Sequence, residues 1–470
     1  MVKQREVHSF FIGLSVISIP FIGSISGIAS LGWLGRELSF YPLVIGMVIW
    51  LMNIVIKGES IKIPQNKSFV YLLYFLVIIL LSGCINCSEI FYVSFNGQSG
   101  LYIFGMQFAS MLCYTAISVY VYNWLRMGDL QTNLKLFYKW LLISFFIAGL
   151  YSVFELGKIL GNETLTNIVV SIDEMFRPQV IDTDTFINYG RIRSVASEAS
   201  YFGMYSGIIF PWIISLPFLV EYRHKFFIPM VYTYFIILNL LSISRTAYFI
   251  FAIQLVLYFI LFRKEIKEIS AYIINSSVLL LVCLLILNSF FDSKFNFDIV
   301  EVFRSILGGD GGMFSSSNDA RFGSQYAALS VFFNNPIIGV GFGLAGIYIV
   351  DFYPSWSLYN VEIKLWTEGV VTQSGLPSTH GLYSRLMAET GMIGLFVWLL
   401  YIFSMAASLL KRINDEYSPR KKIILKGFFI SLVGVFMFAF NIDAFRLMAY
   451  WIIFSYIWYL IDCNDTIDDN

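Results

Sequence analysis

Twelve long apolar segments divide this chain, and they limit its fold more than any other sequence feature. They lie at about 9–30, 38–56, 68–85, 100–122, 136–156, 199–220, 226–243, 246–262, 271–288, 381–410, 423–440 and 445–461. About 20 apolar residues suffice for a helix to cross the hydrocarbon core of a bilayer. Charged residues make up 13% of the chain, about half of their usual share in soluble domains. The sequence therefore predicts an all-α integral membrane protein with about 12 transmembrane helices.

The basic residues predict which side of the membrane each connection faces. With a cytoplasmic N-terminus, the inner connections hold 19 of the 31 Lys and Arg residues. These are Lys3, Arg5, Lys57, Lys62, Lys67, Arg126, Lys135, Lys139, Arg223, Lys225, Arg263, Lys264, Lys267, Lys411, Arg412, Arg420, Lys421, Lys422 and Lys426. The outer connection 86–99 has none. Because cytoplasmic loops are enriched in Lys and Arg, we expect both termini to be cytoplasmic.

This map divides the chain into three regions. Residues 1–288 hold the first nine transmembrane helices, with an outer segment at 157–198. Residues 289–379 form a large loop on the face opposite the cytoplasm, between helices nine and ten. Residues 380–470 hold helices ten to twelve and a short acidic cytoplasmic tail.

The large outer loop has signs of internal structure. Residues 320–333 have apolar side chains at helical spacing, after a helix-start signal at Asn318 and before the stop signal Asn334-Asn335-Pro336. The glycines of 339–343 predict a flexible turn, and the Gly-rich and Ser-rich stretch 308–318 predicts a mobile one. The aromatic residues Trp356, Tyr359 and Trp366 indicate a loop that packs on the membrane surface, since disordered segments are poorer in them.

Several arginines remain on the outer side, against the charge bias. Arg191, Arg193, Arg245 and Arg446 lie at the outer membrane surface, Arg321 lies in the large loop, and Arg385 lies inside the start of helix ten. A single arginine of this kind also fits a salt bridge to Glu198, Glu389 or Asp443, or contact with lipid headgroups. Several guanidiniums on one face are more typical of a site for a polyanion, such as a lipid phosphate or pyrophosphate.

His380 is the candidate general base. It is one of three histidines, and the other two, His8 and His224, lie on the predicted inner side. It follows Ser378-Thr379, which we expect to cap the helix that His380 opens. The partial positive charge of a helix N-terminus favours a neutral imidazole, and a neutral imidazole can accept a proton. A capping or packing role is the alternative, and no metal is expected because no second histidine lies outside.

Three strings occur in the order found in a known family. The string 191–203 leads into a helix, 242–248 lies at an outer turn, and the third runs from Arg321 through 334–343 to 380–394. Together with the topology, these strings resemble the bacterial O-antigen polymerase (Wzy) and O-antigen ligase (WaaL) superfamily. The strings cover about a quarter of the chain, and the topology match covers all of it.

The resemblance implies a fold of the membrane glycosyltransferase C type and a glycan donor linked to undecaprenyl pyrophosphate. It implies that Arg245 and Arg321 hold the donor pyrophosphate, with Arg191 or Arg193 nearby, and that His380 is the catalytic base. Glu198, Arg385 and Glu389 are expected to support this site. No cofactor and no metal are expected, because the pyrophosphate bond carries the energy and guanidiniums can offset the charge of the leaving group.

The expected function is that of a polysaccharide polymerase at the periplasmic face of the bacterial inner membrane. It would transfer a growing glycan from undecaprenyl pyrophosphate to a lipid-linked repeat unit. Ligases usually have Asn where Gly381 stands, so an O-antigen ligase or related oligosaccharyltransferase is the second reading. A transporter or flippase is the third, although we find no repeat between the two halves.

The expected partners follow from the same reading. They are undecaprenyl-pyrophosphate-linked oligosaccharides, membrane lipid and a chain-length regulator protein. Nucleic acid is not expected, because the formal net charge is zero.

Overall fold

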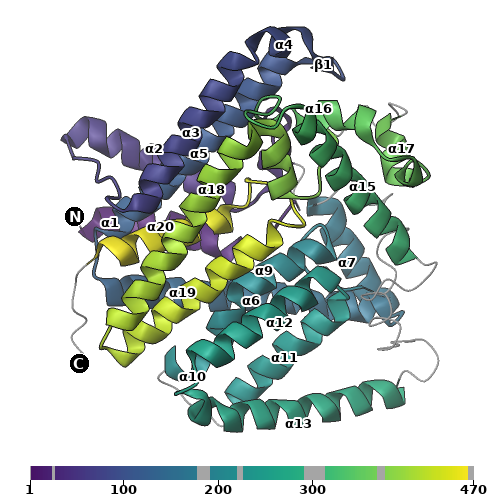
Figure 1. Cartoon of the computed structure of the whole chain (residues 1–470). Helices are drawn as coiled ribbons and strands as arrows, with labels where there is room; N and C mark the ends of the chain where they lie inside the picture. Colours follow the sequence, from purple (N-terminus) through teal and green to yellow (C-terminus); the bar gives the residue numbers. More distant parts are fainter. Residues whose placement is uncertain are drawn as a thin grey trace.

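Helices account for nearly all of the regular structure of the computed structural model, which describes residues 2–23, 27–176, 191–219, 226–290, 313–367 and 376–463 (Figure 1). The helices are α1 (Val2–Ile17), η1 (Ala29–Arg36), α2 (Phe40–Lys57), α3 (Lys67–Ile85), α4 (Cys87–Tyr92), α5 (Gly100–Leu125), α6 (Leu130–Ile159), α7 (Glu163–Phe176), α9 (Ala199–Ile214), α10 (Leu216–Leu219), α11 (Phe227–Ser242), α12 (Arg245–Leu261), α13 (Ile266–Phe290), α15 (Met313–Asn334), α16 (Ala345–Tyr348), η2 (Ile349–Phe352), η3 (Ser355–Ser357), α17 (Val361–Thr367), α18 (Leu382–Asp415), α19 (Pro419–Phe438) and α20 (Met448–Asp462). The strands β1 (Ser94–Phe95) and β2 (Gln98–Ser99) form a small antiparallel hairpin.

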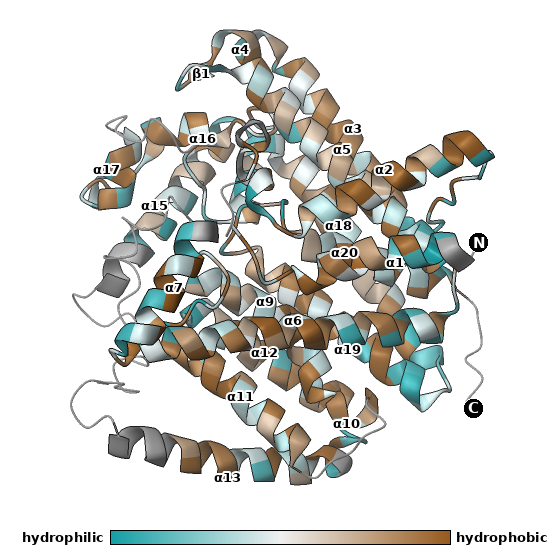
Figure 2. Cartoon of the chain, turned by 180° about the vertical axis from the view of Figure 1, so that it is seen from behind, coloured by the Kyte–Doolittle hydropathy of each residue, from teal (hydrophilic) through white to brown (hydrophobic). Residues whose placement is uncertain are grey.

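Each of the twelve segments expected to cross the membrane contains helix. Among the described residues, five helices are long and apolar enough to span a bilayer, namely α2, α3, α5, α6 and α18. Shorter apolar helices of 10–17 residues include α9, α11, α12 and α20. Figure 2 shows hydrophobic residues along much of α6, α11 and α12, and hydrophilic residues at the turn between α18 and α19. The chain is therefore an all-α membrane protein, and the number of twelve spans stays a prediction.

The first helix differs from its expected range. It was expected at 9–30 and instead ends at Ile17, shortly before Pro20, whose backbone has no N–H to donate to a helix. The chain then turns and forms the 3-10 helix η1 before α2 begins. This irregular stretch supplies Leu31, Gly32 and Leu34 to the cavity described below.

The long helices pack side by side. In Figure 1, α3, α5 and α18 run together, and α18 packs against α3 while α20 packs against α5. Large aromatic side chains fill the space between them, and Phe75, Trp451 and Trp458 are fully buried. Both ends of the described chain lie on the same side of the molecule in Figure 1, away from α15, α16 and α17. This arrangement leaves the start of α18 beside the segments of the large loop.

The large loop has a small core of its own. Val331, Leu344 and Ile363 pack there with Ile90 of α4 and Ala388 of α18. Helix α15 ends at Asn334 as predicted, but it begins at Met313. Of the stretch 308–318 that was expected to be mobile, 313–318 are therefore helical, and 308–312 lie outside the described residues.

The glycine segment 339–343 is not the flexible turn that its composition predicts. Helix α18 is broken at Gly391, which has a φ of 63°, so its neighbouring carbonyls lack helical partners. Val340 N donates to Ala388 O (2.9 Å) and Gly341 N donates to Glu389 O (3.0 Å). A Cβ at Gly339 would lie 2.5 Å from Ala388 O, so only glycine permits this approach. The segment is thus fixed against the break.

The expected membrane contact of the loop aromatics is compatible with their exposure. Trp356 is 49% exposed and Tyr359 is 83% exposed, which leaves both rings free to meet lipid. Trp366 differs, because it lines the cavity. Contact of the first two with the membrane stays a prediction.

Candidate active site

A cavity of about 540 Å³ lies beside the start of α18. Side chains from α5, α9, α15, α17, α18 and the connections that flank α18 and α19 line it. The sequence-predicted residues that line it are Glu198, Arg321, His380, Arg385, Glu389 and Arg446. Tyr102, Tyr114, Tyr201 and Trp366 also line it and offer aromatic faces. The fold therefore brings segments that are far apart in the sequence to one chamber.

His380 lies two residues before helix α18 and does not open it. The helix begins at Leu382, and Gly381 occupies the capping position without a side-chain hydrogen bond. His380 has a φ of 53°, in the left-handed region that bulky residues rarely adopt. Its ring atom Nε2 lies 3.1 Å from Oε1 of Glu362 on α17. The ring therefore faces a carboxylate, which the expectation of a lone histidine at a helix end did not include.

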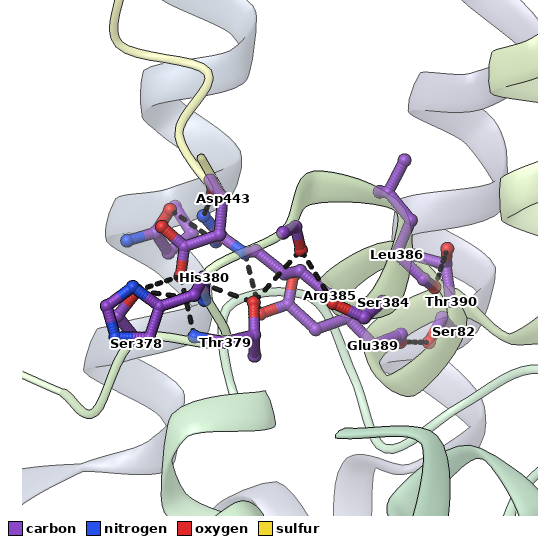
Figure 3. Close-up of polar contacts among 12 residues, drawn as sticks. Ser82, Ser378, Thr379, His380, Ser384, Arg385, Leu386, Glu389, Thr390 and Asp443 are labelled. Atoms are coloured by element: carbon purple, nitrogen blue, oxygen red, sulfur yellow. Dashed lines mark hydrogen bonds and ion pairs between the residues drawn. The ribbon is translucent and has the colours of Figure 1, made fainter. Parts of the chain in front are cut away.

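Asp443 fixes the turn that carries His380 (Figure 3). Ser378 Oγ and Thr379 N donate to Asp443 Oδ2 at 2.9 and 2.8 Å. His380 N donates to Ser378 Oγ (3.0 Å). Burial alone would raise the pKa of Asp443, but the charges of Arg385 and His380 and these hydrogen bonds hold it below its ordinary value. Asp443 thus stays an ionised acceptor beneath the turn.

Gln325 holds the same turn from the large loop. Its Nε2 donates to His380 O (3.1 Å) and to Phe440 O (3.0 Å) after helix α19. Gln325 stands four residues after Arg321 on α15, so both side chains lie on one helix face. Helix α15 therefore sets the position of Arg321 relative to His380.

Three arginines form a positive cluster beside the cavity. Arg191 donates to Ser242 O (3.2 Å) and Ile243 O (3.0 Å) at the end of α11. Burial lowers the pKa of Arg191, and the charges of Arg245 and Arg321 lower it further. The charge of Arg321 also acts on Arg245, which is the first residue of α12. Mutual repulsion of this kind favours a bound anion.

Arg193 does not belong to this cluster. It is 3% exposed, and among the described residues it is not one that lines the cavity. Its Nη2 lies 2.6 Å from Asp173 Oδ2, and its Nε lies 3.7 Å from Glu155 Oε1. A buried guanidinium requires such carboxylates to offset its charge. These ion pairs give Arg193 a structural role between α6 and α7, and its contact with the donor stays a prediction.

Arg385 and Arg446 line the cavity but are held by protein partners. Arg385 donates to Glu389 Oε1 (3.0 Å), Asp443 O (2.7 Å) and Gln107 Oε1 (3.1 Å). Both Arg385 and Glu389 therefore brace the wall of the cavity.

Arg446 donates to Glu37 Oε1 (2.9 Å) and Tyr201 hydroxyl (2.8 Å). Burial raises the pKa of Glu37 to about 7, although Arg446 opposes this shift. Glu198 is exposed at the cavity and accepts a hydrogen bond from Ser200 Oγ (2.9 Å). Contact of Glu198 with a substrate stays a prediction.

Sequence reasoning missed Glu362, Gln325 and Glu37. Each reaches the site through packing between elements that are distant along the chain, and none stands in a string with a known spacing. Asp443 was noted only as a partner for an arginine. The one signal that could have found Gln325 is its four-residue spacing from Arg321, which places both residues on one face of α15.

Comparison with known families bears on the segment that holds this site. Residues 230–399 match the model of the family Wzy_C, described as O-antigen ligase. No curated protein sequence matches the chain. The matched range begins within α11 and ends within α18, so it contains Arg245, Arg321 and His380.

Proposed function

We propose that this chain is a polysaccharide polymerase of the O-antigen polymerase and ligase superfamily, a proposal supported by the family match over residues 230–399. It transfers a growing glycan from undecaprenyl pyrophosphate to a lipid-linked repeat unit at the periplasmic face of the bacterial inner membrane. The observation that supports this most is the shared cavity of Arg321 and His380, with Arg245 and Arg191 beside Arg321.

The chemistry requires a base and a site for a leaving pyrophosphate. A hydroxyl of the acceptor sugar attacks the anomeric carbon of the donor sugar, and the bond from that carbon to the pyrophosphate oxygen breaks. The electron pair of this bond leaves with undecaprenyl pyrophosphate, and His380 takes the hydroxyl proton. The guanidiniums of Arg245 and Arg321 offset the charge on the leaving group. The pyrophosphate bond supplies the driving force, so the reaction needs no nucleotide and no metal.

The surroundings of Gly381 favour the polymerase over the ligase. Ligases usually have Asn at this position. A Cβ at Gly381 would lie 3.0 Å from Ser384 Oγ, 3.1 Å from Phe440 O and 3.2 Å from Gln325 Nε2. An asparagine would therefore crowd the turn and disturb the contact of Gln325 with His380. The site is built without the acceptor contact that this asparagine implies.

Elongation by the purified protein tests the proposal. The full chain in liposomes receives lipid-linked repeat units with EDTA and without nucleotide, and the products are separated by length. We expect a ladder of polymer from the wild type. We expect at least about 10²-fold less from His380→Ala, because proton transfer is lost. His224→Ala is the matched control and should behave as the wild type.

The same assay separates the alternatives. Transfer to a lipid A core acceptor without elongation of the repeat unit would assign the protein as a ligase. Loss of wild-type activity in EDTA would end the metal-free mechanism. Polymer of normal amount from His380→Ala would show that His380 is not the base.

A further inference from the structure

We propose that Glu362 is the positioning partner of His380 and fixes the imidazole with its proton on Nε2, which leaves Nδ1 as the basic nitrogen. This inference rests on the proposed role of His380 as the base. Its starting observation is the 3.1 Å distance between His380 Nε2 and Glu362 Oε1, in a cavity that both residues line. No feature of the sequence or of the family match assigns a role to Glu362.

The charge state of Glu362 determines which ring nitrogen carries the proton. Burial would raise the pKa of Glu362, but the hydrogen bond and charge of His380 and the charge of Arg321 bring it below its ordinary value. At neutral pH the carboxylate is therefore ionised and can only accept a hydrogen bond. Nε2 must then be the donor. In a neutral imidazole with a proton on Nε2, the free lone pair is on Nδ1.

Hydrogen bonds fix the backbone around His380 from several sides, so only the rotation of its side chain is still to be set. Ser378 Oγ accepts from His380 N, and Gln325 Nε2 donates to His380 O. The φ of 53° is a strained conformation that these contacts maintain. A single strong acceptor on Nε2 is then sufficient to set the ring plane and the tautomer.

Helix α17 presents Glu362 in a defined place. Its backbone N donates to Asn360 Oδ1 (2.9 Å) at the start of the helix. The next residue, Ile363, is 1% exposed and packs in the core of the loop. The core of the loop thus fixes the start of α17 beside the ring, while the side chain of Glu362 itself is 49% exposed.

Glu362 acts on the reaction through His380. When Nδ1 takes the proton of the acceptor hydroxyl, the imidazole becomes a cation with protons on both nitrogens. An ionised carboxylate on Nε2 stabilises that cation and holds the ring in the direction of the attack. Removal of the carboxylate should therefore lower kcat and leave the KM for the lipid-linked donor unchanged.

Nitrogen-15 NMR of the histidine rings tests the tautomer directly. The full chain carries three histidines, and the His380 signals are those missing from the His380→Gln variant. At mildly alkaline pH we expect a protonated Nε2 and an unprotonated Nδ1 in the wild type. Glu362→Gln should give a mixture, since an amide both donates and accepts, and Glu362→Asp should keep the wild-type preference in part. A proton on Nδ1 in the wild type, or an unchanged spectrum in Glu362→Gln, would overturn the assignment.

Polymerisation kinetics provide the second readout. We expect Glu362→Gln to lower kcat by about 10²-fold or more. Glu362→Asp should recover part of this loss, and Asp351→Asn, on the same loop but exposed, should have no effect. If Glu362→Gln alters the tautomer but keeps normal kcat, the proposed base role of His380 fails and the positioning role of Glu362 fails with it. If His380→Ala is inactive while the tautomer is independent of Glu362, the proposed function stands and this inference is wrong.

Discussion

Substitution of Arg245 or Arg321 by lysine separates the effect of positive charge on activity from the effect of guanidinium geometry. A guanidinium binds a phosphate through two parallel N–H groups, whereas the ammonium of lysine is a point charge. We therefore expect Arg245→Lys and Arg321→Lys each to lower polymerisation by about 10²-fold while the protein still inserts in the membrane. The measurement is elongation of lipid-linked repeat units by purified variants present in equal amounts.

Arg263→Lys is the matched control for these variants. Arg263 is exposed just beyond the end of α12, at the opposite end from Arg245. It should keep wild-type activity. Polymer at the wild-type level from both Arg245→Lys and Arg321→Lys would mean that these arginines contact lipid headgroups and not the donor.

Asp443 should make the free energy of unfolding decrease as the pH falls into the acidic range. Its folded-state pKa is below the ordinary 3.8, so its contribution is present above that value and is lost as pH falls through the lower folded-state pKa. At pH 7 we expect Asp443→Asn to lose about 1–3 kcal/mol, because the buried hydrogen bonds lose their charged acceptor. Thermal unfolding in detergent at pH 7, 5 and 3 measures this difference between variant and wild type. It should be similar at pH 7 and 5 and smaller at pH 3; a difference that grows on acidification would refute the assignment.

At the residue scale, the sequence pointed to several of the charged residues that line the cavity, but not to the residues that hold them in place. His380, Arg321 and Arg385 were recognisable because a basic residue on the outer side is unusual whatever it contacts. Arg193 showed the same signal, yet its burial beside Asp173 follows from helix packing, which no local pattern contains. Glu362 was hidden for the same reason.

The break in α18 is the element with the strictest steric requirement. A Cβ at Gly391 would lie 2.3 Å from Ile337 O, at a φ of 63°. We expect Gly391→Ala to destabilise the fold by about 1–3 kcal/mol or more, through backbone strain and overpacking together. The midpoint of thermal unfolding in detergent, followed by fluorescent size-exclusion chromatography, measures the effect.

Gly105→Ala provides the comparison within a regular helix. Gly105 is exposed on α5, and a Cβ there would meet nothing within 4 Å. Alanine should leave the midpoint unchanged or raise it, since glycine weakens a helix interior by about 0.5–1 kcal/mol. Equal midpoints for Gly391→Ala and Gly105→Ala would show that the break is not required.

Helices were easier to foresee than their interruptions. Long apolar runs predict α2, α3 and α5 within a few residues, because length and hydropathy are properties of the run itself. The end of α1 before Pro20 and the break in α18 depend on what packs against each helix. The glycines of 339–343 suggested a turn, and only their partner in α18 shows why they are needed.

At the scale of the whole molecule, we expect Tyr359 and Tyr417 to lie on opposite sides of the membrane. Both residues are highly exposed, one before α17 in the large loop and the other between α18 and α19. In a variant without native cysteines, an impermeant thiol reagent applied to intact spheroplasts should label Tyr359→Cys and not Tyr417→Cys. Both should react after the membrane is permeabilised. The reverse pattern in intact cells would invert the predicted topology.

The hydrogen bonds from Val340 and Gly341 to the carbonyls of α18 have a consequence for the order of assembly. Residues 339–343 are synthesised before α18, yet they have no pairing partner until that helix arrives. Without residues 339–343 beside them, the carbonyls of Ala388 and Glu389 would enter the membrane without hydrogen-bond donors, at a cost of several kcal/mol each. The break in α18 therefore requires residues 339–343 to be in place when the tenth predicted span is inserted.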